Sequence, residues 1–223
     1  MSAKPKAVMA WSTGKDSALA LHTARQAGEF DVVGILTTLT SEYNRVSMHG
    51  VREEILDRQA AALGLPCTKV WVPPNCTNAI YEAAMEAALK PLKAQGVEHY
   101  IFGDLYLEDI RSYREKNLAK LGLHGVFPLW LKPTRALADQ MLAAGLDAIV
   151  TCVDTQKLPA DFAGRHFNAQ FLKDLPVGID PCAENGEFHS CCIAGPMFSA
   201  PLKVSVGERV TRGDFVFADV LPA

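Results

Sequence analysis

The stretch KAVMAWSTGKDSALALHTARQAG, residues 6–28, decides the fold. Its first part, Lys6 to Trp11, is a short apolar run of the kind that forms a buried strand. Its last part, Ser17 to Gly28, is rich in alanine and leucine, and Gly28 ends it in the manner of a helix C-cap. The polar turn Ser12–Ser17 joins the two. A strand, a polar turn and a helix in succession predict an α/β protein whose first turn lies at the carboxyl end of a strand.

The same alternation continues along the chain to Gly103. We expect further strands at 31–38, 68–72 and 98–102, and helices at 51–63 and 75–95, the second helix being disturbed in its last turn by Pro91. Strands that alternate with helices of this length form βαβ units, so we predict a doubly wound parallel sheet. The turns Ser12–Ser17 and Gly103-Asp104 both follow strands, and we therefore place both on the same edge of the sheet.

The second part of the chain is less regular. We expect helices at 107–121 and 133–144, a buried strand at 146–153, and short strands at 188–193, 202–206 and 214–220. A boundary near Gly125 divides the chain into a first domain, residues 1–125, and a second, smaller mixed α/β domain, residues 126–223. We expect the two to share an interface and to form a cleft.

The composition narrows the classes of partner and location. The net charge is −3 and the pI about 6.1, whereas a protein whose main partner is nucleic acid usually carries a basic surface, so nucleic acid is disfavoured. No segment approaches the roughly 18 apolar residues of a membrane helix, so we expect no membrane partner and a cytoplasmic location. The six cysteines would stay reduced there, and they form no C-x-x-C pair, which argues against structural zinc. The sequence leaves a homo-oligomer open.

The Ser12–Ser17 turn has the chemistry of a phosphate-binding loop. Unpaired amides at a helix start and the helix dipole attract an anion, and Gly14 lets the backbone approach it closely. Lys15 adds a full positive charge, Ser12 and Ser17 add hydroxyl donors, and Asp16 can hold a magnesium ion. The alternative is a plain strand-to-helix turn with Ser17 or Asp16 as the N-cap. The loop fits neither G-x-x-x-x-G-K-[ST] nor G-x-G-x-x-G, so those two kinds of nucleotide site are disfavoured.

This loop resembles the S-G-G-x-D-S pyrophosphate loop of the adenine-nucleotide alpha hydrolase superfamily, with Thr13 in place of the first glycine. Further motifs are similar, in their order, to those of the diphthine–ammonia ligase family, and the similarity covers nearly the whole chain. The most specific is the DPCAENGEFH run from Asp180 to His189, in which Ala183 stands where a glycine is expected. The other runs are MHGVR at 48–52, GDLYLED at 103–109, RSYRE at 111–115 and FPLW at 127–130.

The resemblance implies an enzyme, an ATP-dependent amide-forming ligase. A substrate carboxylate would attack the α-phosphate of ATP, pyrophosphate would leave, and ammonia would then displace AMP from the acyl-adenylate. The implied cofactors are ATP and Mg²⁺. The family's named substrate is a modified histidine side chain of translation elongation factor 2, and a small-molecule acid is the alternative. A non-catalytic adenine-nucleotide-binding module is a second functional class that stays open.

The resemblance and the placement of the motifs also imply site residues. We expect catalytic roles for Lys15, Asp16, Glu184 and Glu187, because paired carboxylates on a tight Asn-Gly turn can position ammonium or accept its proton. The nucleotide would bind to Ser12, Thr13, Gly14, Lys15, Asp16, Ser17, Gly103 and Asp104, and the metal ion to Asp16 and Asp104. The substrate would bind to His49, Arg52, Glu108, Arg111 and Asn185.

Several of these residues have an ordinary structural role as the alternative. The Glu184–Glu187 segment is also typical of a tight turn, Asp104 and Glu108 of a solvated helix start, and His49 of a cap or surface residue. The pair Cys191-Cys192 raises sulfur transfer as another reaction. We disfavour it, because adjacent cysteines in a strand point to opposite faces and one of them would be buried as a small apolar residue.

Overall fold

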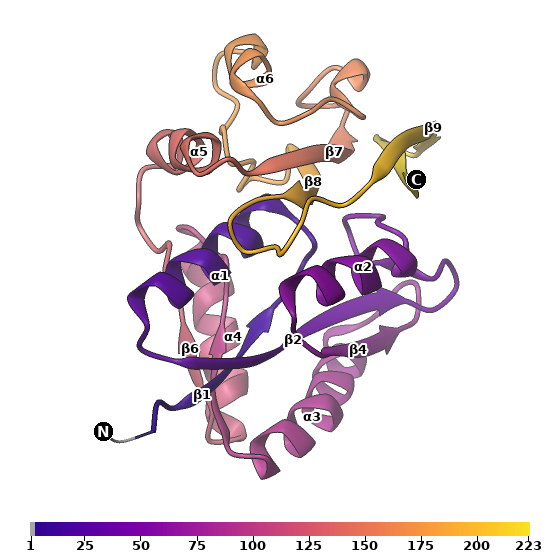
Figure 1. Ribbon diagram of the computed structural model, residues 1–223. Coiled ribbons are helices and arrows are strands. Elements are labelled where there is room, and N and C mark those ends of the chain that lie inside the picture. The colour runs from indigo at the N-terminus through magenta and orange to yellow at the C-terminus, as the bar shows by residue number, and fades with distance from the viewer. Residues whose placement is uncertain (1–2) are drawn as a thin grey trace.

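The computed structural model describes residues 3–223, which fold around two sheets (Figure 1). The strands of the first sheet are β1 (Lys6–Ala10), β2 (Asp31–Thr40), β3 (Arg45–Val46), β4 (Cys67–Val72), β5 (Val97–Ile101) and β6 (His124–Val126). Parallel strands lie in the order β4-β2-β1-β5-β6, and β3 pairs antiparallel with the end of β2. The chain therefore reverses its direction of travel across the sheet between β1 and β5.

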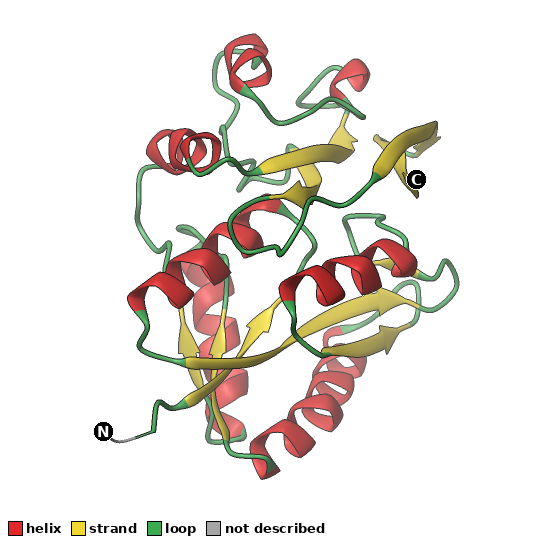
Figure 2. Ribbon diagram, viewed as in Figure 1, coloured by secondary structure: helices red, strands yellow, loops and turns green. Residues whose placement is uncertain are grey.

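Helices cover both faces of this sheet. Figures 1 and 2 show α1 (Lys15–Ala27) and α2 (Glu53–Leu63) on one face, and α3 (Asn78–Ala94) and α4 (Glu108–Lys120) on the other. The predicted doubly wound parallel sheet is confirmed. In α1 the alanine- and leucine-rich face is buried, and Gly28 ends the helix with a φ of +66°, a left-handed conformation that glycine adopts without strain. Pro91 lies inside α3, which nevertheless continues to Ala94.

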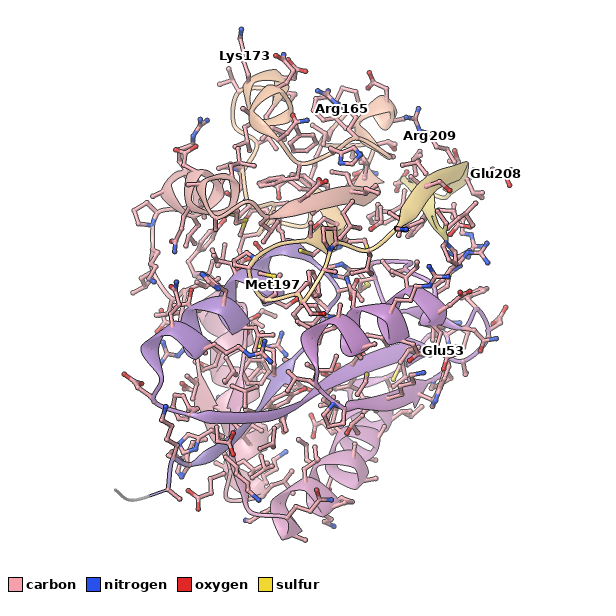
Figure 3. All side chains as sticks on the ribbon, in the orientation of Figure 1. Glu53, Arg165, Lys173, Met197, Glu208 and Arg209 are labelled. Carbon is pink, nitrogen blue, oxygen red and sulfur yellow. The ribbon has the colours of Figure 1, made fainter. Side chains whose placement is uncertain are left out.

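The second sheet is antiparallel and smaller, as expected for the mixed second part. Its strands are β7 (Asp147–Asp154), β8 (Phe188–Ala194), β9 (Val204–Arg212) and β10 (Phe215–Pro222), in the order β8-β7-β10-β9. It is accompanied by α5 (Thr134–Ala143), a 3₁₀ turn (Ala160–Phe162) and α6 (Ala169–Asp174). The outer strand β9, which carries the Glu208 and Arg209 labelled in Figure 3, is mostly exposed.

The two sheets share one hydrophobic core. Trp11 and Leu19 from the first half belong to the same buried cluster as Val150 and Phe188 from the second. Met197, labelled in Figure 3, is buried in this cluster, and its carbonyl accepts a hydrogen bond from Arg25 of α1 at 3.3 Å. The halves thus pack as one unit, and the boundary between 1–125 and 126–223 stays a prediction. Between residues 3 and 223, no helix is both long and apolar enough to span a membrane.

Candidate active site

The site lies where the strand order reverses. In a parallel sheet, the loops after two strands that diverge from such a point leave a crevice at the carboxyl edge. Here those loops follow β1 and β5, and between them lies a cavity of about 380 Å³. Its lining includes Ser12, Lys15, Asp16, Ser17, His49, Gly103, Asp104, Arg114, Glu184, His189 and Ser190.

The conformation of the loop after β1 is fixed by hydrogen bonds of its own hydroxyl groups and of the second sheet. The Ser12 hydroxyl accepts a hydrogen bond from the Gly14 amide at 3.3 Å, and the Ser17 hydroxyl donates to the Gly14 carbonyl at 2.9 Å. From β8, the Ser190 hydroxyl accepts from the Lys15 amide at 3.3 Å. The first turn of α1 thus starts at the cavity, where its amides and the positive end of its dipole can meet an anion.

Two positions at which the family pattern has glycine have left-handed backbones. Thr13 has a φ of +71° and Ala183 a φ of +60°. Side chains with a Cβ reach this region at a cost of about 1–2 kcal/mol, so glycine suits both positions better. The loop keeps its shape around Thr13 because the Thr13 carbonyl accepts hydrogen bonds from the Cys192 amide at 2.8 Å and from Gln59 at 3.1 Å.

The turn after β5 packs directly on the phosphate loop. A Cβ atom added to Gly103 would lie 2.9 Å from the carbonyl carbon of Asp16 and 2.9 Å from the amide nitrogen of Ser17. The expectation that both turns lie on one edge of the sheet is therefore confirmed. Glycine is required here by the close approach of two backbones.

We expect Gly103→Ala to destabilise the fold by about 1–3 kcal/mol and to weaken ATP binding, because the backbone of the loop must move to admit the methyl group. Chemical denaturation and ATP titration measure the two effects. Gly207→Ala is the matched control: its new Cβ would meet the movable Leu221 side chain at 2.9 Å, away from the cavity. Equal ATP affinities for the wild type and Gly103→Ala would contradict the packing argument.

Lys15 joins the loop to the turn that precedes β8. Its Nζ lies 2.9 Å from an Asp16 carboxylate oxygen and 2.5 Å from the Cys182 carbonyl. The rings of Phe188 and Phe167 surround it, with centroids at 5.1 and 5.7 Å. Burial by itself lowers the pKa of Lys15, but the negative charges of Asp16 and Glu184 outweigh it and raise the pKa above its ordinary value. The ammonium group is therefore a fixed positive charge at the cavity.

Glu184 faces the loop from the other side. One of its oxygens accepts a hydrogen bond from the Leu105 amide at 2.9 Å, which anchors the carboxylate to the turn after β5. Burial raises the pKa of Glu184 to about 7, the Leu105 bond works against this, and the charges of Asp16 and Asp104 add to it. A carboxylate with a pKa near 7 can both accept and return a proton at neutral pH.

Asp104 lines the cavity as an ion pair. Both of its oxygens accept hydrogen bonds from Arg114, at 2.6 and 3.1 Å. Arg114 also stacks on Phe102, with its guanidinium carbon 4.5 Å from the ring centroid. Between residues 3 and 223, no group of three or more histidine, cysteine, aspartate or glutamate side chains is placed to hold a metal ion.

Glu187 and Asn185 lie within the turn rather than in the lining of the cavity. Glu187 is 3% exposed, and one of its oxygens accepts hydrogen bonds from the Asp180 amide at 3.2 Å and from the Asn185 side chain at 3.3 Å. Asn185 is exposed and also accepts from the Tyr106 hydroxyl at 3.3 Å. These contacts fix the turn that carries Glu184.

Three of the predicted substrate-binding residues lie outside the lining of the cavity. Arg52 pairs with Asp219 of β10, its Nη2 lying 2.5 Å from an Asp219 carboxylate oxygen. Arg111 pairs with Glu115 at 2.9 Å and lies 4.7 Å from the ring centroids of both Phe127 and Trp130. Glu108 is exposed at the start of α4.

The Arg52–Asp219 contact predicts a structural effect. Asp219 also accepts from Arg45 at 2.8 Å, so one carboxylate ties two arginines of the first half to the last strand. Partial burial opposes this charge, but both arginines together lower the pKa of Asp219 to about 2. A carboxylate with a depressed pKa stabilises the fold above its unfolded pKa, near 4, and this contribution disappears as the pH falls toward 2.

We therefore expect Asp219→Asn to cost about 2 kcal/mol at pH 7, the usual scale for hydrogen bonds to a charged group, and to cost less as the pH falls from 4 to 2. Urea unfolding at several pH values measures this. Asp139→Asn, in an exposed pair with Arg135, is the control and should change the stability little. A loss that does not depend on pH would contradict the assignment.

His49 lies directly over the loop, next to His189, which ends the DPCAENGEFH run but was not predicted as a site residue. Its Nδ1 is 2.9 Å from the Ser190 carbonyl, and a Cβ on Gly14 would lie 2.7 Å from its Cε1. The His49 and His189 ring centroids are 4.7 Å apart. Burial lowers the pKa of His49 to about 4 and that of His189 to about 3. Since a carbonyl can only accept, the neutral His49 carries its proton on Nδ1.

Known proteins are similar in sequence to nearly the whole of this chain. The family model for the diphthamide synthase N-terminal domain matches residues 5–125, and that for the diphthamide synthase C-terminal domain matches residues 133–221. A zebrafish (Danio rerio) diphthine–ammonia ligase is 25% identical over 230 residues, covering 94% of this chain and 90% of the relative. Rat (Rattus norvegicus) and bovine (Bos taurus) diphthine–ammonia ligases are each 28% identical over 120 residues, covering 51% of this chain and less than half, 45%, of the relative. The chain belongs to the diphthamide synthase family.

Proposed function

We propose that the protein is an ATP-dependent ammonia ligase that adenylates a substrate carboxylate and converts it into an amide. The relatives from zebrafish, rat and cattle are all named for a ligase that uses ammonia. The observation that carries the proposal here is the pairing of a phosphate loop with the Glu184 carboxylate across one cavity, at the point where the strand order reverses.

The residues around the cavity have different roles in the proposed reaction. The loop from Ser12 to Ser17 and the charge of Lys15 hold the β- and γ-phosphates, so that the substrate carboxylate attacks the α-phosphate and the bond to pyrophosphate breaks. Ammonia then attacks the acyl carbon, and the bond to AMP breaks. Glu184 accepts the proton that the nitrogen loses. Glu187, buried beneath the same turn, keeps Glu184 in position.

Magnesium is part of this proposal. One oxygen of Asp16 is buried at the cavity without a hydrogen-bond partner among residues 3–223, and such an oxygen suits a hard cation. A magnesium ion with one protein carboxylate and the phosphates as its other ligands would fit, because Mg²⁺ commonly binds in this way. Asp104 is the less suitable candidate, since both of its oxygens already accept hydrogen bonds from Arg114.

The acyl substrate is either a modified protein side chain, as the name diphthine–ammonia ligase of the relatives indicates for them, or a small-molecule acid. The position of the cavity is compatible with both.

Product analysis tests the reaction class. With ATP labelled on the α- and γ-phosphates, an acid and ammonium, we expect AMP and pyrophosphate in equal amounts, both dependent on the acid. ADP and phosphate as the products would contradict the proposal. Binding of ATP without cleavage, under every acid and ammonium condition, would favour the non-catalytic nucleotide-binding module instead.

A further inference from the structure

A groove between α3 and α4 adjoins the candidate active site. It is lined by Met85 and Leu89 of α3, Leu118 of α4, and Tyr100 and Phe102 at the end of β5. All of these side chains are buried and belong to one hydrophobic cluster, separate from the cluster that joins the two sheets. The groove holds about 100 Å³, the scale of a short alkyl chain or a single ring.

The groove lies next to the cavity of the phosphate loop. Tyr81, Tyr100, Phe102 and Arg114 line both spaces. The side chain of Arg114 therefore lies between the groove and the cavity and can contact a ligand from either space. A ligand bound on both sides of Arg114 would have one polar end beside the nucleotide and an apolar part between the helices.

Arg114 stands at the junction with unused hydrogen-bonding capacity. A guanidinium has five N–H groups, and two of them donate to Asp104. The remaining three have no acceptor among residues 3–223. A planar cation of this kind, set against the face of Phe102, is suited to bind a carboxylate through two parallel hydrogen bonds.

The polar groups at the outer end of the groove neutralise one another. Glu82 accepts a hydrogen bond from the Tyr113 hydroxyl at 3.0 Å and pairs with Lys120 at 3.2 Å. Glu86, which also lines the groove, pairs with Lys90 at 2.7 Å, so among residues 3–223 each acidic side chain of the groove has a partner of opposite charge. The groove thus favours an apolar arm over a charged one.

We propose that this groove binds the apolar arm of the acyl substrate and that Arg114 holds the substrate carboxylate where it meets the nucleotide. The inference rests on the proposed ligase function and names its substrate class. That class is a carboxylic acid whose arm is the size of one ring or a short chain, either as a free molecule or as part of a protein side chain.

A binding experiment tests the groove without relying on catalysis. Protein labelled at its methyl groups, saturated with an ATP analogue that cannot be cleaved between the α- and β-phosphates, is titrated with a panel of acids from butyrate to 4-phenylbutyrate. We expect saturable shifts of the Met85 and Leu118 methyl signals in NMR spectra. Val210 of β9, which lines a different cavity between residues 40–52 and the strands β9 and β10, is the internal control and should not shift. If no acid shifts the Met85 signal, the inference is wrong, whether or not ATP is cleaved.

Variants then separate the two cavities in the pyrophosphate-exchange reaction. Met85→Trp, which fills the groove, should raise the KM for the acid by about tenfold or more and leave the KM for ATP within about twofold. Val210→Trp, the matched control, should change neither. Arg114→Lys should also raise the KM for the acid, because a lysine cannot replace the two parallel hydrogen bonds.

Further experiments test whether a variant simply fails to fold and whether the natural acid is free or part of a protein. If Met85→Trp does not fold, Leu89→Ala widens the groove and should shift the preference toward longer acids. The same variants assayed with a carboxylate on a protein side chain show whether the natural arm is free or protein-borne. If the KM for the acid is raised in Val210→Trp and not in Met85→Trp, the apolar arm binds in the other cavity and the inference is wrong.

Discussion

Lys15→Met is expected to reduce turnover by about 10²–10³, the typical loss when one preorganised charge partner of the transition state is removed. The pyrophosphate that leaves the α-phosphate carries negative charge, and Lys15 is a buried cation at the loop that would bind it. Methionine keeps most of the volume between Phe167 and Phe188 while removing the charge. The rate of pyrophosphate release, measured with saturating ATP and acid, gives the effect.

A loss of folding must be separated from a loss of catalysis, because Lys15 also neutralises Asp16. Removing one partner of a buried pair commonly costs about 3–5 kcal/mol, since it leaves the other charge uncompensated. Adding Asp16→Asn to Lys15→Met should restore much of the stability but not the turnover. Lys157→Met is the matched control and should change turnover little. Lys157 donates a hydrogen bond at 2.8 Å to the Asn185 carbonyl, on the turn that Lys15 also contacts, but it lies outside the lining of the cavity. Normal turnover in a folded Lys15→Met protein would refute the role of the loop.

Glu184→Gln is expected to slow amide formation by about 10²–10⁴, the usual contribution of a positioned general base. Because the pKa of Glu184 lies at about 7, the carboxylate is protonated below pH 7 and takes up a proton only above it. When the concentration of free NH3 is held constant at each pH, the wild-type rate of ammonia transfer should therefore rise through pH 7 and level off, and the variant should lose that rise. Rapid-quench measurement from pH 5.5 to 8.5, starting from the preformed acyl-adenylate, shows this directly.

The same pKa makes a separate prediction for stability. A carboxyl whose folded pKa is raised disfavours the folded state increasingly between its unfolded pKa, near 4.3, and 7. Wild-type stability should thus decline over this range more than that of Glu184→Gln. Glu108→Gln, at the exposed start of α4, serves as the control and should alter neither profile. A pH-rate profile that Glu184→Gln leaves unchanged would show that another group accepts the proton.

Most of the fold could be predicted because its elements are long enough to show a period. The apolar runs of β1, β2, β4 and β5, separated by helical stretches of 11 to 17 residues, leave few arrangements other than a parallel sheet. The two-residue β3 and three-residue β6 were not expected, since so few residues carry no pattern and their pairing depends on neighbouring strands. The left-handed conformations of Thr13 and Ala183 explain why glycine is expected at both positions.

The site was predictable where it is contiguous in the chain and not where it depends on distant partners. The residues from Ser12 to Ser17 are placed by one strand and one helix. Arg52 is close in sequence to His49, but the side chain of Arg52 pairs with Asp219, 167 positions later, and lies outside the cavity lining. Arg114 was not selected as a site residue, although it shares a helix face with Arg111, because only the folded chain shows which of the two meets Asp104.

A similar difference separates Glu184 from Glu187. The two glutamates are three positions apart on one turn, and Gly186 between them has a φ of +77°, which turns the backbone sharply. One side chain therefore lines the cavity while the other is buried beneath the turn. No spacing rule for helices or strands predicts the directions of side chains across such a turn.

The hydrogen bonds between Thr13 and β8 have a consequence for how the protein selects its ligands. The Cys192 amide and the Gln59 side chain both hold the Thr13 carbonyl, and Gln59 also donates to the Cys192 carbonyl at 2.7 Å. Opening the two halves about a hinge would break these buried bonds and divide the shared core. We therefore expect a preorganised site: little conformational entropy would be lost when a nucleotide binds, and discrimination between acids would come from the fixed shape of the site rather than from closure around the correct one.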